Sequence, residues 1–183
     1  MNYQKLYECL FCAVRTAGIV ANMMQATIVN EGKQVEVVED EDERHLRMRE
    51  AKTRADEIVQ EILLQSLLPE YQAVLSLDVE EDTVSRTCFL KQDYDYTLVL
   101  DPIDGTRAFI HNAFHFGTLI AVERDDGNGF QPMLGVISHP HVGVWLIGDG
   151  KRTVLHGPGS RVRQVHCKET KNLADATLVV TSH

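Results

Sequence analysis

The spacing of apolar residues changes once along this chain of 183 residues, and that change limits the folds open to it. From Tyr3 to Met24 apolar residues recur every three or four positions, and the same spacing returns from about Thr53. Each stretch predicts an amphipathic helix with one buried face. We expect Pro69 to end the second helix, because proline lacks the backbone N–H that continues the hydrogen-bond ladder.

Beyond Pro69 the pattern becomes a series of short β-rich runs separated by turn residues. After a short apolar run at 73–77, the runs cover residues 96–100, 117–123, 132–138, 142–148, 152–157, 162–167 and 176–182. Two helices followed by a mostly antiparallel meander predict an α+β fold of layered α-β-α type, with two long helices on the sheet. The length predicts a single domain over residues 1–183. Since the last run almost reaches the carboxyl terminus, the second face of the sheet is exposed, or covered by another chain, or covered by sequence that this chain has lost.

Charge and cysteine usage exclude several classes of protein. Residues 36–50 are mostly charged and lack an apolar face, which predicts a solvated, mobile loop. The formal net charge is -9 and the Lys and Arg residues are scattered, so we expect no nucleic-acid partner. No uninterrupted apolar run is long enough to predict a membrane partner. Four cysteines without the spacing of a disulfide framework predict reduced thiols and a cytoplasmic protein.

The segment 101–106, with the sequence DPIDGT, directly follows the β-rich run at 96–100. We expect Asp101 at the end of that strand, a turn at Pro102, and Asp104 one tight turn later, so that the two carboxylates converge. Hard cations such as Mg²⁺ prefer oxygen ligands, and a pair of them about 3.5–4 Å apart can share the work of hydrolysing a phosphate monoester. A simple Asp-Pro-x-Asp-Gly surface turn is the alternative interpretation.

A short helical run at 106–112 is predicted to begin directly after Gly105. Its free N–H groups would point towards phosphate oxygens, with help from the helix dipole. Asp104, Gly105 and Thr106 are therefore the residues that we expect at the substrate phosphate. The hydroxyl of Thr106 would in addition hold the attacking water.

Two further acidic positions precede this motif. Glu80 and Glu81 lie in the run LDVEEDT after an apolar stretch, and Asp56 lies near the predicted start of the second helix. Taken singly, each has a plain structural explanation. The first is a solvated acidic loop, and the second is an acid placed favourably in a first helical turn.

The order and spacing of the three acidic segments resemble the inositol monophosphatase superfamily over nearly the whole chain. The segments are KTRADEIVQEIL at 52–63, VEED at 79–82 and LDPIDGTRAF at 100–109. The resemblance implies a sugar-phosphatase-like fold and Mg²⁺-dependent hydrolysis of a small phosphate monoester, with two or three Mg²⁺ ions in a complete site. It also allows a homodimer.

The resemblance assigns roles to individual residues. The implied metal ligands are three carboxylates and one carbonyl: Glu80, Asp101, the carbonyl of Ile103, and Asp104. Asp56 would hydrogen-bond Thr106, and this pair with Glu80 would orient and deprotonate the nucleophilic water. Asp56, Glu80 and Thr106 are thus the implied catalytic residues.

The chain also departs from the family pattern. Val79 stands where the family usually has a glycine, and the only tryptophan, Trp145, is followed by Leu146 instead of the aspartate that completes the second metal site. The resemblance therefore covers the family's amino-terminal portion, and we expect this chain to lack the carboxyl-terminal subdomain. Residues 116–140 look closer to histidinol-phosphate phosphatases, although inositol monophosphates remain comparable substrates. The alternative function is a truncated, non-catalytic metal-binding or interaction protein.

Overall fold

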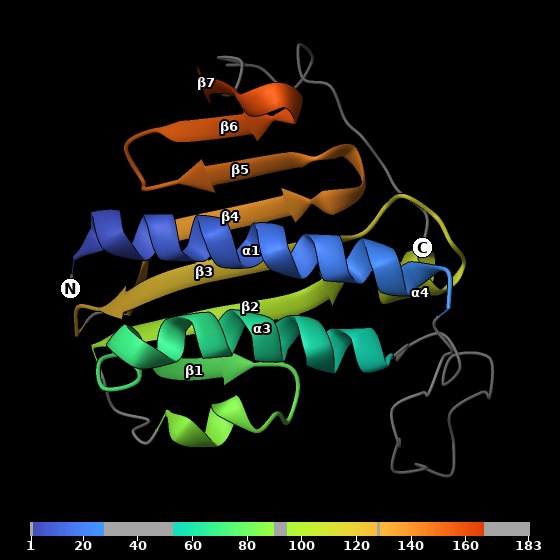
Figure 1. Cartoon of the computed structure of the whole chain (residues 1–183). Coiled ribbons are helices and arrows are strands. Elements are labelled where there is room, and N and C mark those ends of the chain that lie inside the picture. Colours follow the sequence, from blue (N-terminus) through green and yellow to red (C-terminus); the bar gives the residue numbers. More distant parts are fainter. Residues whose placement is uncertain (1, 28–52, 90–94, 128, 167–183) are drawn as a thin grey trace, which may run out of the picture.

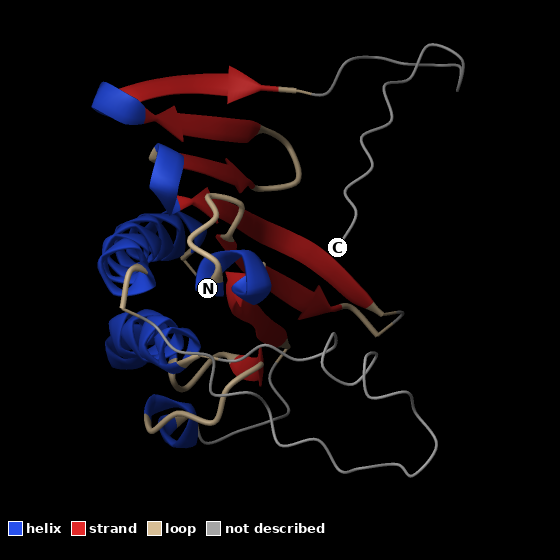
Figure 2. Ribbon diagram, turned by 90° about the vertical axis from the view of Figure 1, so that its right-hand side faces the viewer, coloured by secondary structure: helices blue, strands red, loops and turns tan. Residues whose placement is uncertain are grey.

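The protein is described by a computed structural model that covers residues 2–27, 53–89, 95–127 and 129–166. Two long helices, α1 (Tyr3–Gln25) and α3 (Arg54–Tyr71), lie side by side on one face of a seven-stranded sheet (Figure 1, Figure 2). Its strands are β1 (Ser76–Val79), β2 (Tyr96–Asp104), β3 (Gly117–Asp125), β4 (Phe130–His139), β5 (Val144–Gly148), β6 (Thr153–Gly157) and β7 (Arg161–Val165). This arrangement confirms the predicted α+β fold.

The described strands follow one another across the sheet in chain order. All neighbouring pairs are antiparallel except β1 and β2, which run parallel with Val79 opposite Leu100. The meander was therefore predicted correctly, whereas the parallel pair was not. Three 3-10 turns accompany the strands: η1 (Ser85–Cys88), η2 (Pro140–Val142) and η3 (Pro158–Ser160).

The apolar stripes of the helices form the core between helices and sheet. On α1, the buried stripe includes Leu6, Leu10, Val14, Ala17 and Ala21, and the helix packs on α3, β3 and β4. By length and composition alone α1 could also cross a membrane, a property that it shares with core helices of globular proteins. The burial of its apolar stripe against the sheet is what a core helix shows.

Several predicted boundaries differ in the structure. Helix α3 continues past Pro69 to Tyr71, because a proline in the last turn costs only one backbone hydrogen bond. Strand β5 begins at Val144, since residues 140–142 form η2, which ends at Gly143 with φ of 64°. The predicted loop at 36–50 and the predicted strand at 176–182 lie outside the described residues.

The two faces of the sheet are unequally covered. Figure 2 shows both long helices on one side, and no long helix among the described residues lies on the other (Figure 2). On the helix side, α3 covers the β1–β2 end, while α1 runs along β3 and β4 (Figure 1). Through Phe11 and Tyr7, α1 also contacts Trp145 of β5 and His156 of β6, so it partly covers these two strands as well.

Candidate metal and phosphate site

The parallel pairing of β1 and β2 brings the acidic segments to one edge of the sheet. Since Val79 is paired with Leu100, Glu80 and Asp101 both follow the paired residues at the same edge. Helix α3 returns to β1 through a short connection and runs in the opposite direction, so its first turn, with Asp56, lies over this edge (Figure 1). Three segments that are far apart in sequence thus meet here.

A turn at Pro102 was predicted from the sequence, but the DPIDGT segment does not turn there. Strand β2 continues to Asp104, and the register changes by one residue: Asp101 is opposite Leu119, whereas Asp104 is opposite Gly117. This β-bulge accommodates a proline that has no N–H to donate, and the hydroxyl of Thr118 donates to the Pro102 carbonyl at 3.0 Å. The bulge, and not a turn, therefore sets the relative directions of Asp101 and Asp104.

Gly105 then connects the strand to a short helix, α4 (Thr106–Ile110), in the place predicted for it. Its φ is +83°, and a Cβ at this position would lie 2.6 Å from the His115 carbonyl oxygen, so only glycine fits. The far end of α4 is tied to α1, because the Gln25 side chain donates to the carbonyls of Phe109 and Ala113. The loop is therefore fixed at both ends.

Asp56 uses its two carboxylate oxygens differently. Oδ2 accepts from the backbone N–H and the hydroxyl of Thr53, which completes a capping box at the start of α3. Oδ1 lies 3.4 Å from the hydroxyl of Thr106. Both interpretations of this acid are thus realised together: it caps the helix and it faces the loop. Burial raises the pKa of Asp56 against the opposing effect of the Thr53 hydrogen bonds.

The Thr106 hydroxyl has one proton and two acceptors within reach. Besides the Asp56 carboxylate, the carbonyl oxygen of Ile103 lies 2.8 Å away. The shorter contact occupies one lone pair of the Ile103 carbonyl, which the resemblance assigns to a metal. Rotation of the hydroxyl so that it donates to Asp56 would free the Ile103 carbonyl and leave the lone pairs of the Thr106 oxygen available as acceptors.

Among the acids of this site, Asp101 has the least favourable environment for a negative charge. Its Oδ1 is buried and has no hydrogen-bond partner among the described residues. Burial raises the pKa of Asp101 to about 7, with further contributions from the negative charges of Glu80, Asp104 and Asp56, while a backbone hydrogen bond from Ile103 opposes the shift. The three neighbouring charges that raise its pKa are all negative, so a cation at this position would favour the ionised carboxylate.

The remaining predicted ligands lie nearby without forming a closed cage. Glu80 and Asp104 are exposed, and within the described ranges no three His, Cys, Asp or Glu side chains meet closely enough to hold a metal together. The donor set nevertheless fits a divalent cation chemically. It offers hard oxygen ligands, a desolvated carboxylate oxygen without a donor, and mutual repulsion that a cation would remove.

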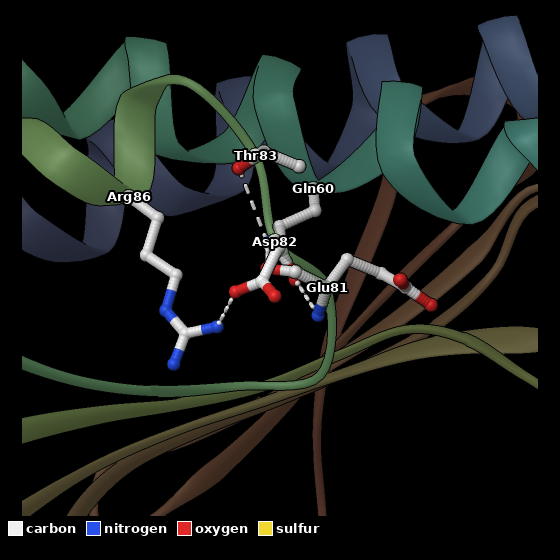
Figure 3. Close-up of polar contacts among 5 residues, drawn as sticks. All are labelled: Gln60, Glu81, Asp82, Thr83 and Arg86. Atoms are coloured by element: carbon white, nitrogen blue, oxygen red, sulfur yellow. Dashed lines mark hydrogen bonds and ion pairs between the residues drawn. The ribbon is translucent and has the colours of Figure 1, made fainter. Parts of the chain in front are cut away.

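Sequence reasoning missed Gln60, a fully buried residue of α3. Its side-chain amide donates to the carbonyl of Glu81 and accepts from the Glu81 N–H at 2.9 Å, as one strand pairs with another (Figure 3). It also donates to the hydroxyl of Thr83 at 3.2 Å. The signal was present in the sequence, since Gln60 lies four residues after Asp56 and so on the same buried side of the helix.

Other contacts fix the chain that follows Glu81. The carboxylate of Glu61 accepts from the N–H and the hydroxyl of Ser85, and these hydrogen bonds hold the segment 81–86 against α3. Within the segment, Arg86 pairs with Asp82 (Figure 3). The position of Glu80 is therefore set from one side by β1 and from the other by this anchored segment.

Comparisons with known proteins agree with this arrangement. The model of the inositol monophosphatase family matches residues 2–183. The chain is 37% identical over 93 residues to the chloroplastic bifunctional phosphatase IMPL2 of Arabidopsis thaliana, an alignment that covers 50% of this chain and 24% of the relative. It is 31% identical over 86 residues to a histidinol-phosphatase of Streptomyces coelicolor, covering 46% and 32%.

Solved structures show the same fold. An IMPase of Thermotoga maritima superposes with a TM-score of 0.60 at 18% identity, over 88% of this chain and 53% of that chain. The extragenic suppressor protein suhB of Bartonella henselae superposes with a TM-score of 0.58 at 16% identity, over 82% and 51%. The chain thus spans about half the length of these structures.

Proposed function

This chain belongs to the inositol monophosphatase family, and we propose on that basis that its carboxylate site hydrolyses a small phosphate monoester with the help of Mg²⁺. One observation carries the proposal beyond family membership. The buried Oδ1 of Asp101 has no hydrogen-bond donor within the described part of the chain, and three acids surround that carboxylate. Such a cluster is costly unless a cation neutralises it.

We assign the cation to the oxygen atoms that converge on this edge of the sheet: Glu80, Asp101, the Ile103 carbonyl and Asp104. The chemistry that Mg²⁺ supplies when bound is positive charge, which offsets the phosphate dianion and makes a nearby water easier to deprotonate. The bulge in β2 allows Asp101 and Asp104 to contribute from one strand.

The chain's own residues would orient the water and the phosphate. With its proton donated to Asp56, the Thr106 oxygen can accept from a water O–H and so fix the direction of that water. The Glu80 carboxylate, exposed at the same edge, is the proposed acceptor of the water's proton. The backbone N–H groups of Gly105 and Thr106, together with Asp104, are assigned to the substrate phosphate.

Histidinol phosphate and inositol monophosphates are the proposed substrate classes. The similarity to a histidinol-phosphatase supports the first, and the family supports the second. Both are small monoesters whose dianionic phosphate needs the same neutralisation. The remainder of each molecule differs in charge, since histidinol carries an amine and an imidazole whereas inositol is neutral.

The test is phosphate release by the protein from histidinol phosphate and from inositol 1-phosphate, each with Mg²⁺ and with EDTA. We expect Mg²⁺-dependent turnover of at least one of the two. The absence of metal-dependent turnover of either substrate, by this chain and by a version extended to the length of its relatives, would contradict the proposal.

A second function is supported by the open face of the sheet. No long helix within the described residues covers that face, so a chain of this length could serve as a metal-binding interaction protein instead (Figure 2). Solution mass and calorimetric Mg²⁺ titration separate the two functions. Mg²⁺ binding with self-association but without turnover would favour the second.

A further inference from the structure

A pocket of about 500 Å³ lies between α1 and strands β5 to β7, on the helix-bearing side of the sheet. Its lining includes Phe11 and Arg15 of α1, Trp145 of β5, His156 of β6, and Arg161 at the start of β7. The volume lies within the range of roughly 300–1,000 Å³ that is typical of small-molecule sites. The pocket shares no residue with the carboxylate site.

Three of the residues that line this pocket carry aromatic rings: Phe11, Trp145 and His156. The ring centroids of Phe11 and His156 are 4.2 Å apart, and the rings of Phe11 and Trp145 meet edge to face at 6.2 Å. A hydrogen bond with Tyr7 holds His156 in place, since its Nε2 lies 2.7 Å from the Tyr7 hydroxyl. Burial and the nearby Arg15 lower the pKa of His156, so the ring stays neutral near pH 7. Fixed, uncharged rings are good stacking surfaces for a planar ligand.

Among the described residues that line the pocket, the charged side chains are two arginines. The guanidinium of Arg15 lies over the rings of Phe11 and Trp145 at 5.4 and 5.5 Å, and the described lining includes Arg161 but no Asp or Glu. Both arginines are exposed, and neither forms an ion pair with another described residue. In a chain with a formal net charge of -9 this local excess of positive charge is unusual. It favours an anionic ligand.

We propose that this pocket binds a planar aromatic anion, a ring that carries a phosphate or a carboxylate. The ligand's ring stacks on one of the aromatic rings that line the pocket, while the two arginines bind the anionic group. A guanidinium suits this role because its donors match the geometry of carboxylate and phosphate oxygens. The site is independent of the proposed hydrolysis, since it needs neither a metal nor the acidic cluster.

Trp145 allows a direct test, because it is the only tryptophan in the chain. The full chain, kept in EDTA, is titrated with AMP while tryptophan fluorescence and calorimetric heat are followed. Adenosine and ribose 5-phosphate serve as ring-only and anion-only controls. We expect saturable AMP binding, with each control weaker by about tenfold or more. Benzoate is measured beside AMP to show whether the pocket takes a carboxylate or a phosphate, and saturable binding of either supports the proposal.

Variants locate the ligand. Arg15→Gln and Arg161→Gln should each weaken binding of the stronger ligand by about tenfold. Arg124→Gln is the matched control, because Arg124 stacks on Tyr96 at 5.9 Å outside the pocket and its loss should leave binding unchanged. Asp104→Asn should also bind normally, which separates this pocket from the carboxylate site. Absence of saturable binding of both AMP and benzoate, equal affinity in the Arg15 variant, or loss of binding in the Asp104 variant would overturn the proposal.

Discussion

The hydroxyl of Thr106 lies 3.4 Å from a carboxylate oxygen of Asp56, although fifty residues separate the two in the chain. The other oxygen of the same carboxylate is 2.7 Å from the Thr53 hydroxyl in the cap of α3. One buried side chain thus links the start of a core helix to the DPIDGT segment. The helix cap gives Asp56 a fixed direction, and that direction places its second oxygen towards the loop.

We expect the hydroxyl of Thr106 to be needed for turnover. Thr106→Val keeps the shape of the side chain but removes the hydroxyl that is proposed to orient the water, so kcat should fall by about 10²–10⁴-fold. Thr106→Ser keeps the hydroxyl and should retain most of the activity. Steady-state phosphate release at saturating Mg²⁺ measures both. Equal activity of the valine and wild-type proteins would remove Thr106 from the mechanism.

Asp104 offers a test in which the fold is left largely intact. The side chain is exposed, so Asp104→Asn should shift the free energy of unfolding by only about 0.5 kcal/mol while abolishing turnover. Asp126→Asn, an exposed acid in the turn between β3 and β4, is the control and should remain active. Phosphate release and thermal melting are measured in parallel. Retained activity of the Asp104 variant would show that this residue belongs to a structural loop only.

The stability of the metal-free protein should depend on pH through Asp101. Because its pKa in the folded state is about 7, above that of an unfolded chain, the folded state binds more protons in between. The stabilisation of the folded state by the protonated Asp101 carboxyl is complete below the pKa of the unfolded chain, and it is lost as pH rises through about 7. In EDTA the melting temperature should therefore decrease as pH rises from 5 to 8, across the pKa of about 7.

The control for the pH prediction is Asp101→Asn, which removes the titrating group. Its melting temperature in EDTA should vary less with pH than that of the wild type. Mg²⁺ should reverse the trend in the wild-type protein, since a cation competes with the proton for the same carboxylate and binds better at pH 8. An identical pH dependence in the two proteins would contradict the assignment of the pKa of about 7 to Asp101.

Local patterns in the sequence predicted the elements of the fold better than the construction of the site. The helical spacing and the β-rich runs depend on neighbouring residues, and they led to the fold, whereas the contact between Asp56 and Thr106 was implied only by the family resemblance. The parallel pairing of β1 with β2 and the bulge at Pro102 depend on long-range contacts, which no local pattern carries. They nevertheless determine how Glu80 and Asp101 approach each other.

Gln60 was missed for a different reason, since a polar residue on a helix is usually exposed. Gln60→Leu should lower the free energy of unfolding by about 1–3 kcal/mol, because the N–H and carbonyl of Glu81 lose their buried partner. It should also raise the Mg²⁺ concentration needed for half-maximal activity, since Glu80 is proposed as a metal ligand.

The matched control for Gln60 is Gln65→Leu on the same helix. Gln65 is exposed, and its amide donates only to the carboxylate of Glu61, at 2.9 Å. Its replacement should change the unfolding free energy by no more than about 0.5 kcal/mol and leave the Mg²⁺ requirement unchanged. Denaturant unfolding and Mg²⁺ activation curves distinguish the two variants. Equal effects of both would show that the Glu81 backbone does not depend on Gln60.

Gly105 and Gly127 allow the strain of the loop to be separated from its crowding. Both have φ of +83°, so an alanine at either position pays the cost of a left-handed backbone, about 1 kcal/mol or more. At Gly127 an added Cβ meets no atom of the described, non-adjacent residues within 4 Å, whereas at Gly105 it would lie 2.6 Å from the His115 carbonyl oxygen. Gly105→Ala should therefore destabilise the protein more than Gly127→Ala and should also displace α4, with loss of phosphatase activity. Chemical denaturation and phosphate release of the two variants are the measurements. Equal stability and equal activity of the two variants would mean that the connection from β2 to α4 can shift without loss of function. A fixed backbone at Gly105 would then not be needed to bind the phosphate.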